Sequence, residues 1–295
     1  MSLLALDIGG TKLASGLWQA GRLAQRQQQA MPRDVDGLHQ LLHSLARAHP
    51  AIDRLAVALT GRTDGSRVHA VNPAMIGYWD GFALRDALAR HWSCPIVLLN
   101  DAQAAAWGEF HADPSGIRDL LFVTLSTGVG GGLVLDAQLR TGRQGLAGHI
   151  GHSRSALVPI DGIQRCACGQ LGCLETLASG TALARQARYL GRPGATASEV
   201  FATAQAGDAP MQALIEQAAQ GVALALAGAT ALADLQSVVI GGSVGLAAGM
   251  TEAIAQQIDR LPAVFRVPVR RARLGADAGL TGVALWAQQQ GHGAT

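Results

Sequence analysis

The stretch LLALDIGGTKLASGLW, residues 3–18, decides the fold class of the chain. Two apolar runs, LLALDI and LASGLW, flank the glycine turn GGTK, and a third run, RLAQRQ at 22–27, follows a second turn, QAG. Strands joined by short glycine turns form antiparallel hairpins. We therefore predict that the chain opens with a three-stranded antiparallel meander.

The first glycine turn carries the side chains of a phosphate site. Asp7 lies at the end of the first strand, and Gly9, Gly10, Thr11 and Lys12 follow it. Backbone amides without side chains can surround phosphate oxygens, while a carboxylate can organise a magnesium ion. Glycines are also typical of a hairpin turn with no ligand, because a residue without a Cβ adopts positive φ without a steric penalty. The carboxylate, hydroxyl and ammonium of this loop favour the phosphate site.

Helices and strands alternate over the next hundred residues. Apolar residues recur at helical spacing over 35–49, and a buried strand is predicted at 54–59. A helix at 82–92, a strand at 95–99 and an alanine-rich helix at 102–110 follow. This alternation is typical of an α/β protein.

Two histidines of the first predicted helix have the spacing of a metal-ligand pair. His39 and His43 lie four residues apart, on one face of that helix. No third ligand is close to them in the sequence. We therefore interpret the pair as part of a surface face.

The opening pattern returns later in the chain. The strand LLFVTLS, the glycine turn TGVGGG and the strand LVLDAQL repeat it, and another apolar strand, SVVI, runs into GGSVG. Two similar meanders imply two related halves facing a cleft. We predict a first lobe at 1–115 and a second at 116–279, with a C-terminal helix of about 280–295 packing back on the first.

Composition excludes several classes of partner. Charged residues make up 15% of the 295 residues, and the formal net charge is +2. The densest basic cluster, VRRAR at 269–273, is typical of a solvated edge, so no nucleic-acid partner is expected. No window reaches the roughly twenty uninterrupted apolar residues of a membrane span. With neither a basic leader nor a cleavage site at the N-terminus, we expect a cytoplasmic protein with no membrane partner.

Five motifs in series resemble one known family. LALDIGGTK, LSTGVGGG and VVIGGSVG are similar to the two phosphate loops and the adenosine loop of the superfamily of sugar kinases, heat-shock chaperones and actin. GHIGH followed by CACGQLGCLE resembles the zinc signature of the ROK family of sugar kinases and repressors, and the likeness runs from Asp7 to about Gly282. The resemblance implies an α/β, two-lobed actin-like ATPase fold, related to ribonuclease H.

The same resemblance implies ATP, Mg²⁺ and the residues that bind them. The first phosphate loop would comprise Asp7, Gly9, Gly10, Thr11 and Lys12. The second would comprise Thr127, Gly128, Gly130 and Gly131, and the adenine and ribose would be approached by Gly241 and Gly242.

Asn100 and Asp101 follow an apolar strand at its C-terminal end, where α/β proteins gather ligand-binding groups. Taken by itself, a carboxylate at this place also suits a helix cap. In the family, the aspartate of this pair is the catalytic base. The resemblance therefore implies that Asp101 accepts the proton of a sugar hydroxyl and that Asn100 holds a neighbouring hydroxyl.

Three of the four cysteines crowd into one short segment. Cys166, Cys168 and Cys173 lie in CACGQLGC, whereas Cys94 stands alone, which suggests metal instead of disulfides. A closed structural zinc site needs a fourth ligand, and the nearest upstream histidine is His152. We expect a structural Zn²⁺ that fastens this loop. A zinc-ribbon-like nucleic-acid module and three unmetallated core cysteines are the alternatives.

His149 bears on the choice of sugar. In ROK glucokinases the position three before the zinc histidine is usually glutamate, and an imidazole offers one donor and one acceptor where a carboxylate only accepts. NDAQAAAWGEF, STGVGGG, GLAGHIGH and GGSVGLA most resemble the bacterial N-acetylmannosamine kinases of the family. This implies ATP-dependent phosphorylation of N-acetyl-D-mannosamine at the 6-hydroxyl, a step of sialic acid breakdown. An ordinary histidine in a glycine-rich loop is the alternative for His149.

Other expectations follow from the family with fewer residues behind them. Asn72 stands before Pro73, where a turn would equally use it. Another ROK hexokinase, for glucose, fructose or N-acetylglucosamine, is an alternative activity, and a repressor is disfavoured because Asp7 leaves no room for a preceding helix-turn-helix. A homodimer that binds sugar and ATP is expected. The further sugar contacts implied by the family are Gly61, Arg62, Asn72, Gly128, His152 and Glu175.

Overall fold

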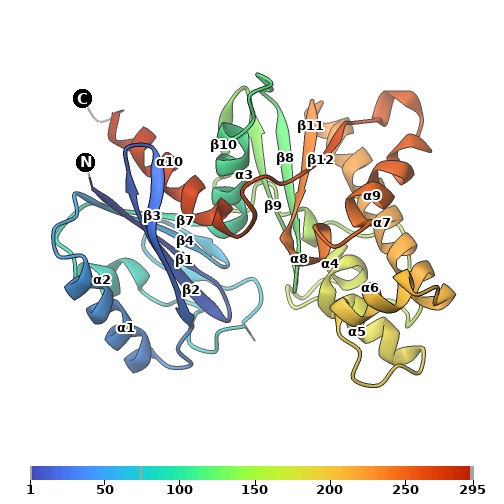
Figure 1. Cartoon of the computed structure of the whole chain (residues 1–295), viewed down its shortest axis with the longest axis horizontal. Coiled ribbons are helices and arrows are strands. Elements are labelled where there is room, and N and C mark those ends of the chain that lie inside the picture. Colours follow the sequence, from blue (N-terminus) through green and yellow to red (C-terminus); the bar gives the residue numbers. More distant parts are fainter. Residues whose placement is uncertain (1, 74, 293–295) are drawn as a thin grey trace. The chain divides into compact units, whose positions relative to one another are not determined.

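The computed structural model describes residues 2–73 and 75–292, and this part of the chain divides into two compact units (Figure 1). The first unit holds the chain up to Ala112, the segment Thr141–Ala147 and the chain from Ala276 onward. The second holds Asp113–Arg140 and Gly148–Gly275. The lobe boundaries 1–115 and 116–279 stay a prediction.

A five-stranded sheet in the order β3-β2-β1-β4-β7 forms the centre of the first unit. The first three strands are antiparallel, which confirms the predicted meander, whereas β4 and β7 run parallel to β1. Parallel strands have their carboxyl ends at one edge, so the residues after β1, β4 and β7 meet there. The strands span Leu3–Ile8 (β1), Lys12–Gln19 (β2), Arg22–Ala30 (β3), Arg54–Leu59 (β4) and Ile96–Asn100 (β7), with a small pair at Arg62–Thr63 (β5) and Val68–His69 (β6).

Four helices belong to this unit: α1 (Val35–Ala48), α2 (Leu84–Ala89), α3 (Asp101–His111) and α10 (Ala278–His292). Leucines on one face of α1 share a buried core with the apolar side of α2 and the sheet. The helix α10 lies against α3, β1 and β4 (Figure 1). The helix predicted at 82–92 is shorter than expected. No side chain caps its start, and its last residues form a turn that buries Trp92.

A second five-stranded sheet, in the order β10-β9-β8-β11-β12, forms the centre of the second unit. The predicted strand 133–139 is wrong. Asp136 and Ala137 have φ of 56° and 60°, so they form a tight turn that separates two strands, as mirror-image hairpin turns do. The strands are Leu120–Leu125 (β8), Val129–Leu135 (β9), Gln138–Arg140 (β10), Ser237–Gly241 (β11) and Val269–Arg271 (β12).

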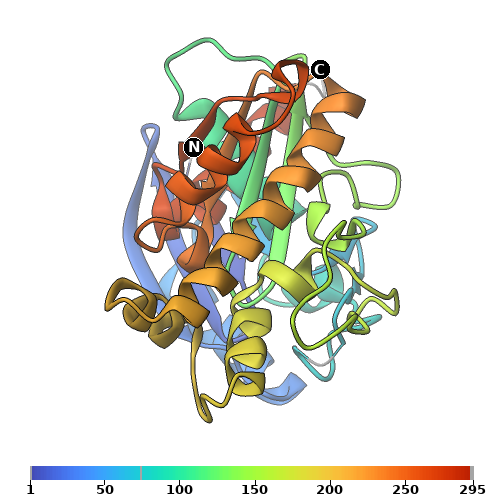
Figure 2. The ribbon, with the colours of Figure 1, turned by 90° about the vertical axis from the view of Figure 1, so that its right-hand side faces the viewer.

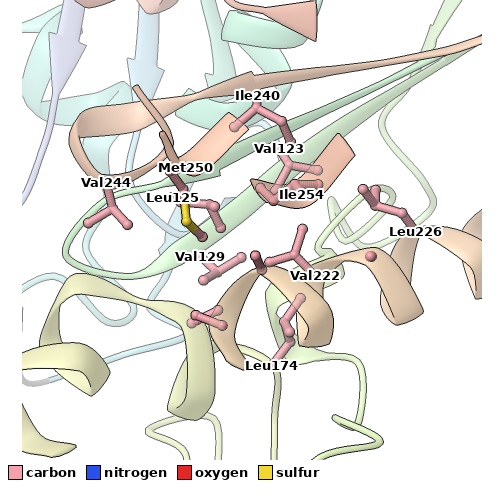
Figure 3. Packing of buried hydrophobic residues seen from close by; sticks show 14 of the residues in the cluster. Val123, Leu125, Val129, Leu174, Val222, Leu226, Ile240, Val244, Met250 and Ile254 are labelled. Carbon is pink, nitrogen blue, oxygen red and sulfur yellow. The ribbon is translucent and has the colours of Figure 1, made fainter. Parts of the chain in front are cut away.

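Helices cover the second sheet, and α7 is the longest of those described. It begins with Asp208 as N-cap and Pro210 in its first turn, and it ends at Asp234 in the left-handed conformation. Figure 2 shows it crossing in front of the strands, and Figure 3 shows Val222 and Leu226 packed with Val123 and Leu125. The helices are Glu175–Ala178 (α4), Gly180–Tyr189 (α5), Ala197–Gln205 (α6), Ala209–Ala233 (α7), Gly242–Gly245 (α8) and Met250–Asp259 (α9), with 3₁₀ turns at Ile150–His152, Ala263–Phe265 and Gly275–Asp277.

Within the described residues, none of the helices is both long enough and apolar enough to cross a membrane.

Candidate active site and metal centre

Asn100 and Asp101 stand where β7 ends and α3 begins. The cap of α3 is Asn100, because its Oδ1 accepts from the backbone N–H of Gln103 at 3.0 Å. Its Nδ2 donates to Asp101 Oδ1 at 2.9 Å and to the carbonyl of Gly61 at 2.8 Å. The N-cap is therefore Asn100, which also holds the aspartate in one orientation. Asp101 Oδ1 accepts from the first-turn N–H of Ala102 at 2.7 Å, so its predicted role at the helix start stands beside the catalytic one.

The carboxylate of Asp101 is poised between its charged and neutral forms. Burial, reinforced by the charge of Asp7, raises its pKa from 3.8 to about 7. Hydrogen bonds from the N–H of Ala102, at 2.7 Å, and from Asn100 oppose that rise. An aspartate with a pKa near 7 is suited to accept a proton at neutral pH.

Asp7 shares the carboxyl-end edge of the same sheet. Burial raises its pKa to about 6, while the charge of Arg26 lowers it. A Cβ at Gly279, near the start of α10, would lie 2.6 Å from Asp7 Oδ2, so glycine is needed there for the helix to approach the carboxylate. Two half-buried carboxylates that repel one another favour a bound cation.

The predicted first phosphate loop follows Asp7 as a tight turn. The N–H of Gly9 donates to the carbonyl of Lys12 at 2.9 Å, which closes the hairpin between β1 and β2. A Cβ at Gly10 would lie 2.5 Å from the terminal methyl of Met75, so this methionine covers the turn. Thr11 and Lys12 are exposed beside it. The loop thus has glycine backbone and an ammonium beside a half-buried carboxylate, with the N–H of Gly9 used within the hairpin.

The predicted sugar contacts of the first unit lie in the loops after β4. Gly61, with φ of +91°, places its carbonyl on Asn100, and Arg62 begins β5. The carbonyl of Asn72 accepts from the N–H of Met75 at 3.2 Å, which is the turn geometry that the sequence left open. Their contacts with sugar stay predictions.

In the second unit, the glycine run of TGVGGG is not a turn throughout. The turn is confined to 126–128, where the N–H of Ser126 donates to the carbonyl of Gly128 at 2.9 Å, whereas Gly130 and Gly131 pair with β8 inside β9. A Cβ at Gly131 would lie 2.4 Å from the carbonyl oxygen of Gly148. The glycines of β9 let the segment 148–152, which carries His149 and His152, pack directly on this strand.

The glycines of the predicted adenosine loop lie at the end of β11 and directly after it. Gly241 ends that strand and Gly242 begins α8. Ser243 Oγ lies 3.2 Å from Ser126 Oγ, and the hydroxyl of Thr181 donates to the carbonyl of Thr127 at 2.8 Å. Hydrogen bonds therefore join the predicted second phosphate loop to the start of α5 and to α8, which follows β11.

His152, Cys166, Cys168 and Cys173 come together as predicted, with one ligand atom from each lying within 4.8 Å of the others. Cys166 Sγ is 3.6 Å from His152 Nδ1, and Cys168 Sγ is 3.6 Å from Cys173 Sγ. Tetrahedral zinc with Zn–S of about 2.3 Å and Zn–N of about 2.0 Å places ligand sulfur and nitrogen about 3.5 Å apart and two ligand sulfurs about 3.8 Å apart. The donor set and its spacing therefore fit Zn²⁺.

Glu175 lies between the cysteine cluster and the predicted second phosphate loop. Its Oε2 accepts from the N–H of Val129 at 3.0 Å, and its Oε1 is 3.6 Å from Cys166 Sγ. A Cβ at Gly128 would lie 2.5 Å from the same carboxylate. The metal cluster, the glutamate and the glycine turn thus form one connected structure in the second unit.

His149 precedes the 3₁₀ turn that carries His152. The two rings are nearly parallel, with centroids 6.3 Å apart, and His149 is not a member of the four-ligand cluster. The structure thus separates the two histidines of GHIGH. Which of them contacts sugar stays a prediction.

Gln103 is a positioning residue that the sequence analysis missed. Its side chain is 1% exposed, and its Nε2 donates to the carbonyls of Thr141 and Ala147 at 3.1 and 3.0 Å. It fixes the segment Thr141–Ala147 against α3 within the first unit. The sequence feature that could have indicated this role is the single amide side chain among alanines, two residues after Asp101.

Comparisons with known proteins agree with this arrangement. The model of the ROK family matches residues 3–290. An N-acetylmannosamine kinase of Yersinia pseudotuberculosis is 44% identical over 288 residues, covering 97% of this chain and 98% of that protein. A ROK family glucokinase from Streptomyces griseus, solved with glucose and AMPPNP, is 28% identical with a TM-score of 0.81, over 98% of this chain and 100% of its own. A ROK hexokinase from Thermus thermophilus is 33% identical with a TM-score of 0.81, and the match covers 99% of this chain and 100% of the hexokinase chain.

Proposed function

The chain belongs to the ROK family, and we propose that it transfers the γ-phosphoryl group of ATP to the 6-hydroxyl of N-acetyl-D-mannosamine. Its likeness to ROK kinases of known structure confirms the predicted two-lobed actin-like ATPase fold. The choice of sugar is supported by 44% identity with an N-acetylmannosamine kinase over nearly the whole chain. The product, N-acetylmannosamine 6-phosphate, would enter sialic acid breakdown.

The observation that carries the proposal is the placement of Asp101. Phosphoryl transfer has a loose transition state, so the enzyme mainly aligns the acceptor hydroxyl and stabilises charge. Asp101, oriented by Asn100 and with a pKa of about 7, would accept the hydroxyl proton as the bond to phosphorus forms. Asn100 already uses both Nδ2 hydrogens and its oxygen within the protein, which favours a positioning role beside any sugar contact.

ATP would be held by the two phosphate loops and by the glycines after β11. Magnesium, when bound with the nucleotide, neutralises phosphate charge, and Asp7 is the carboxylate beside the first loop that would orient it. Lys12 would add a positive charge to the same loop. Asp7 and Asp101 repel each other's negative charge in the free protein, and a cation at Asp7 would relieve that repulsion.

Zinc at His152 and the three cysteines would have a structural role. Four protein ligands leave no open position for a water, so the ion would fasten the segment that carries His149 and Glu175. Those two residues, together with Gly128 and His152, are the proposed sugar contacts of the second unit. The hydrogen bond from Val129 to Glu175 supports this, because it holds the carboxylate beside the second phosphate loop.

An ATP-coupled phosphorylation assay tests the proposal. The acceptors are N-acetylmannosamine, N-acetylglucosamine, glucose, mannose and fructose, compared by kcat/KM. We expect N-acetylmannosamine to be preferred. A preference for glucose would overturn the choice of sugar while leaving the kinase assignment in place, and no transfer to any sugar would overturn both. A homodimer and a cytoplasmic location stay predictions.

A further inference from the structure

Three histidines outside the candidate active site lie together in the first unit. His39 and His43 are four residues apart in α1, and His91 follows α2. The ring centroid of His91 is 5.9 Å from that of His39 and 5.8 Å from that of His43. The folded chain therefore supplies the third imidazole that the sequence around α1 lacks.

The backbone that carries these histidines is held by the hydrophobic core. Leu38 and Leu42 on α1 and Leu88 and Trp92 around the end of α2 belong to one buried cluster. The cluster fixes the two elements against each other, while His43 remains exposed and His39 and His91 are half-buried. The backbone positions of the three residues are thus fixed by the core, while their partly exposed side chains can still rotate.

The ring centroids lie near the spacing of a metal site, although the ligand nitrogens do not converge within 4.8 Å of one another as those of the cysteine cluster do, so the rings would have to rotate to bind an ion. Two imidazoles on one tetrahedral ion, with metal–nitrogen bonds of about 2.0 Å, have ring centroids about 5 Å apart. The observed separations exceed this by less than an ångström, a gap that side-chain rotation can close. In addition, Nε2 of His91 is buried and has no hydrogen-bond partner among the described residues. A buried ring nitrogen without a hydrogen-bond partner destabilises the folded state, and a bond to a metal ion would remove that destabilisation.

We propose that His39, His43 and His91 form a second metal site, which binds a borderline divalent transition ion such as Ni²⁺ or Zn²⁺. Imidazole nitrogens suit these ions, whereas Mg²⁺ and Ca²⁺ require oxygen ligands. This all-nitrogen site differs in chemistry from the cysteine-rich cluster of the second unit. With three protein ligands it keeps an open position for water, and it would cross-link α1 to the turn after α2.

The test uses untagged full-length protein whose cysteine cluster is loaded with zinc. Calorimetric titration with Ni²⁺ should show one further ion bound per chain, and Ni²⁺ should raise the Tm. His43→Gln, an exposed position whose change leaves the core intact, should weaken Ni²⁺ binding more than tenfold, because even partners outside the ligand shell are worth about 10- to 100-fold. His39→Gln should do the same. Ser44→Ala, exposed on the same helix, is the matched control and should bind Ni²⁺ like the original chain.

A spectrum distinguishes the two metal sites. Co²⁺ added to the zinc-loaded protein should give ligand-field bands without the thiolate-to-metal charge transfer that cysteine ligation produces. The proposal is overturned if no Ni²⁺ binds beyond the zinc, if His43→Gln and His39→Gln bind Ni²⁺ as tightly as the original chain, or if the added Co²⁺ shows thiolate charge transfer. None of these results depends on the kinase activity.

Discussion

Replacement of Asp101 by asparagine separates its chemical role from its cost to stability. The amide keeps the shape of the side chain and an oxygen that can accept the existing hydrogen bonds from Ala102 and Asn100. It removes the negative charge and the ability to take a proton. Loss of a general base costs about 10²- to 10⁴-fold in rate, so we expect kcat to fall by that amount while sugar affinity stays largely intact.

The same change should stabilise the protein at high pH. A folded-state pKa raised above the unfolded value favours the protonated form, so this contribution to stability is present below about pH 4 and lost as the pH rises through about 7. The pKa of Asp101 rises from 3.8 to about 7 on folding, and each pKa unit corresponds to about 1.4 kcal/mol. The pH-dependent change in the free energy of unfolding is therefore at most about 4 kcal/mol. Because Asp101 is partly exposed, solvent screening lowers this to about 2 kcal/mol.

Two measurements check this reasoning. Coupled kinase assays of the original chain should show kcat/KM falling as the pH drops through about 7, when Asp101 takes up a proton. Denaturant unfolding at pH 8 and pH 4 should show Asp101→Asn as the more stable protein only at pH 8. Asp259→Asn, an exposed carboxylate on α9, is the control and should change neither property. A near-normal kcat for Asp101→Asn, or an equal stability difference at both pH values, would refute the assignment.

Three further predictions concern the second unit. His152→Ala should release zinc and lower both the Tm and the sugar affinity, as read by metal analysis, thermal unfolding and KM; retention of zinc would contradict the ligand assignment. His149→Glu should change the order of preferred sugars in the kinase assay with zinc retained, and loss of the metal would show that the two histidines act together. Gly131→Ala should destabilise the fold by about 1–3 kcal/mol in denaturant unfolding, because the new Cβ would meet the carbonyl of Gly148 at 2.4 Å. Gly228→Ala, with nothing within 4 Å, is its control and should be neutral or stabilising; an equal loss of stability in both variants would exclude the steric explanation.

Sequence pattern predicted the elements whose signals are local. The meander of β1 to β3 follows from apolar runs broken by glycine turns, and β4 was predicted at its observed bounds, Arg54–Leu59. The four members of the cysteine cluster were also predicted together, because the cysteines are close in sequence and a histidine precedes them. In these cases neighbouring residues carry the information, so little of it depends on the rest of the fold.

Other features were misjudged for an identifiable physical reason. Gly130 and Gly131 looked like a turn because glycine serves both turns and close packing, and only the carbonyl of Gly148 shows which use applies. The strand at 133–139 failed because the turn at Asp136 and Ala137 contains no glycine.

The sequence by itself determined the first meander, the buried strand at Arg54–Leu59, the glycine turn after Asp7 and the composition of the cysteine cluster, because each depends on side chains a few residues apart. Only the tertiary structure decided that Asn100 caps α3 and orients Asp101, that Glu175 is held by the amide of Val129, and that His91 joins His39 and His43. These outcomes depend on burial, on hydrogen bonds and on the close approach of segments distant in the chain. Such contacts are set by packing, which no local pattern contains.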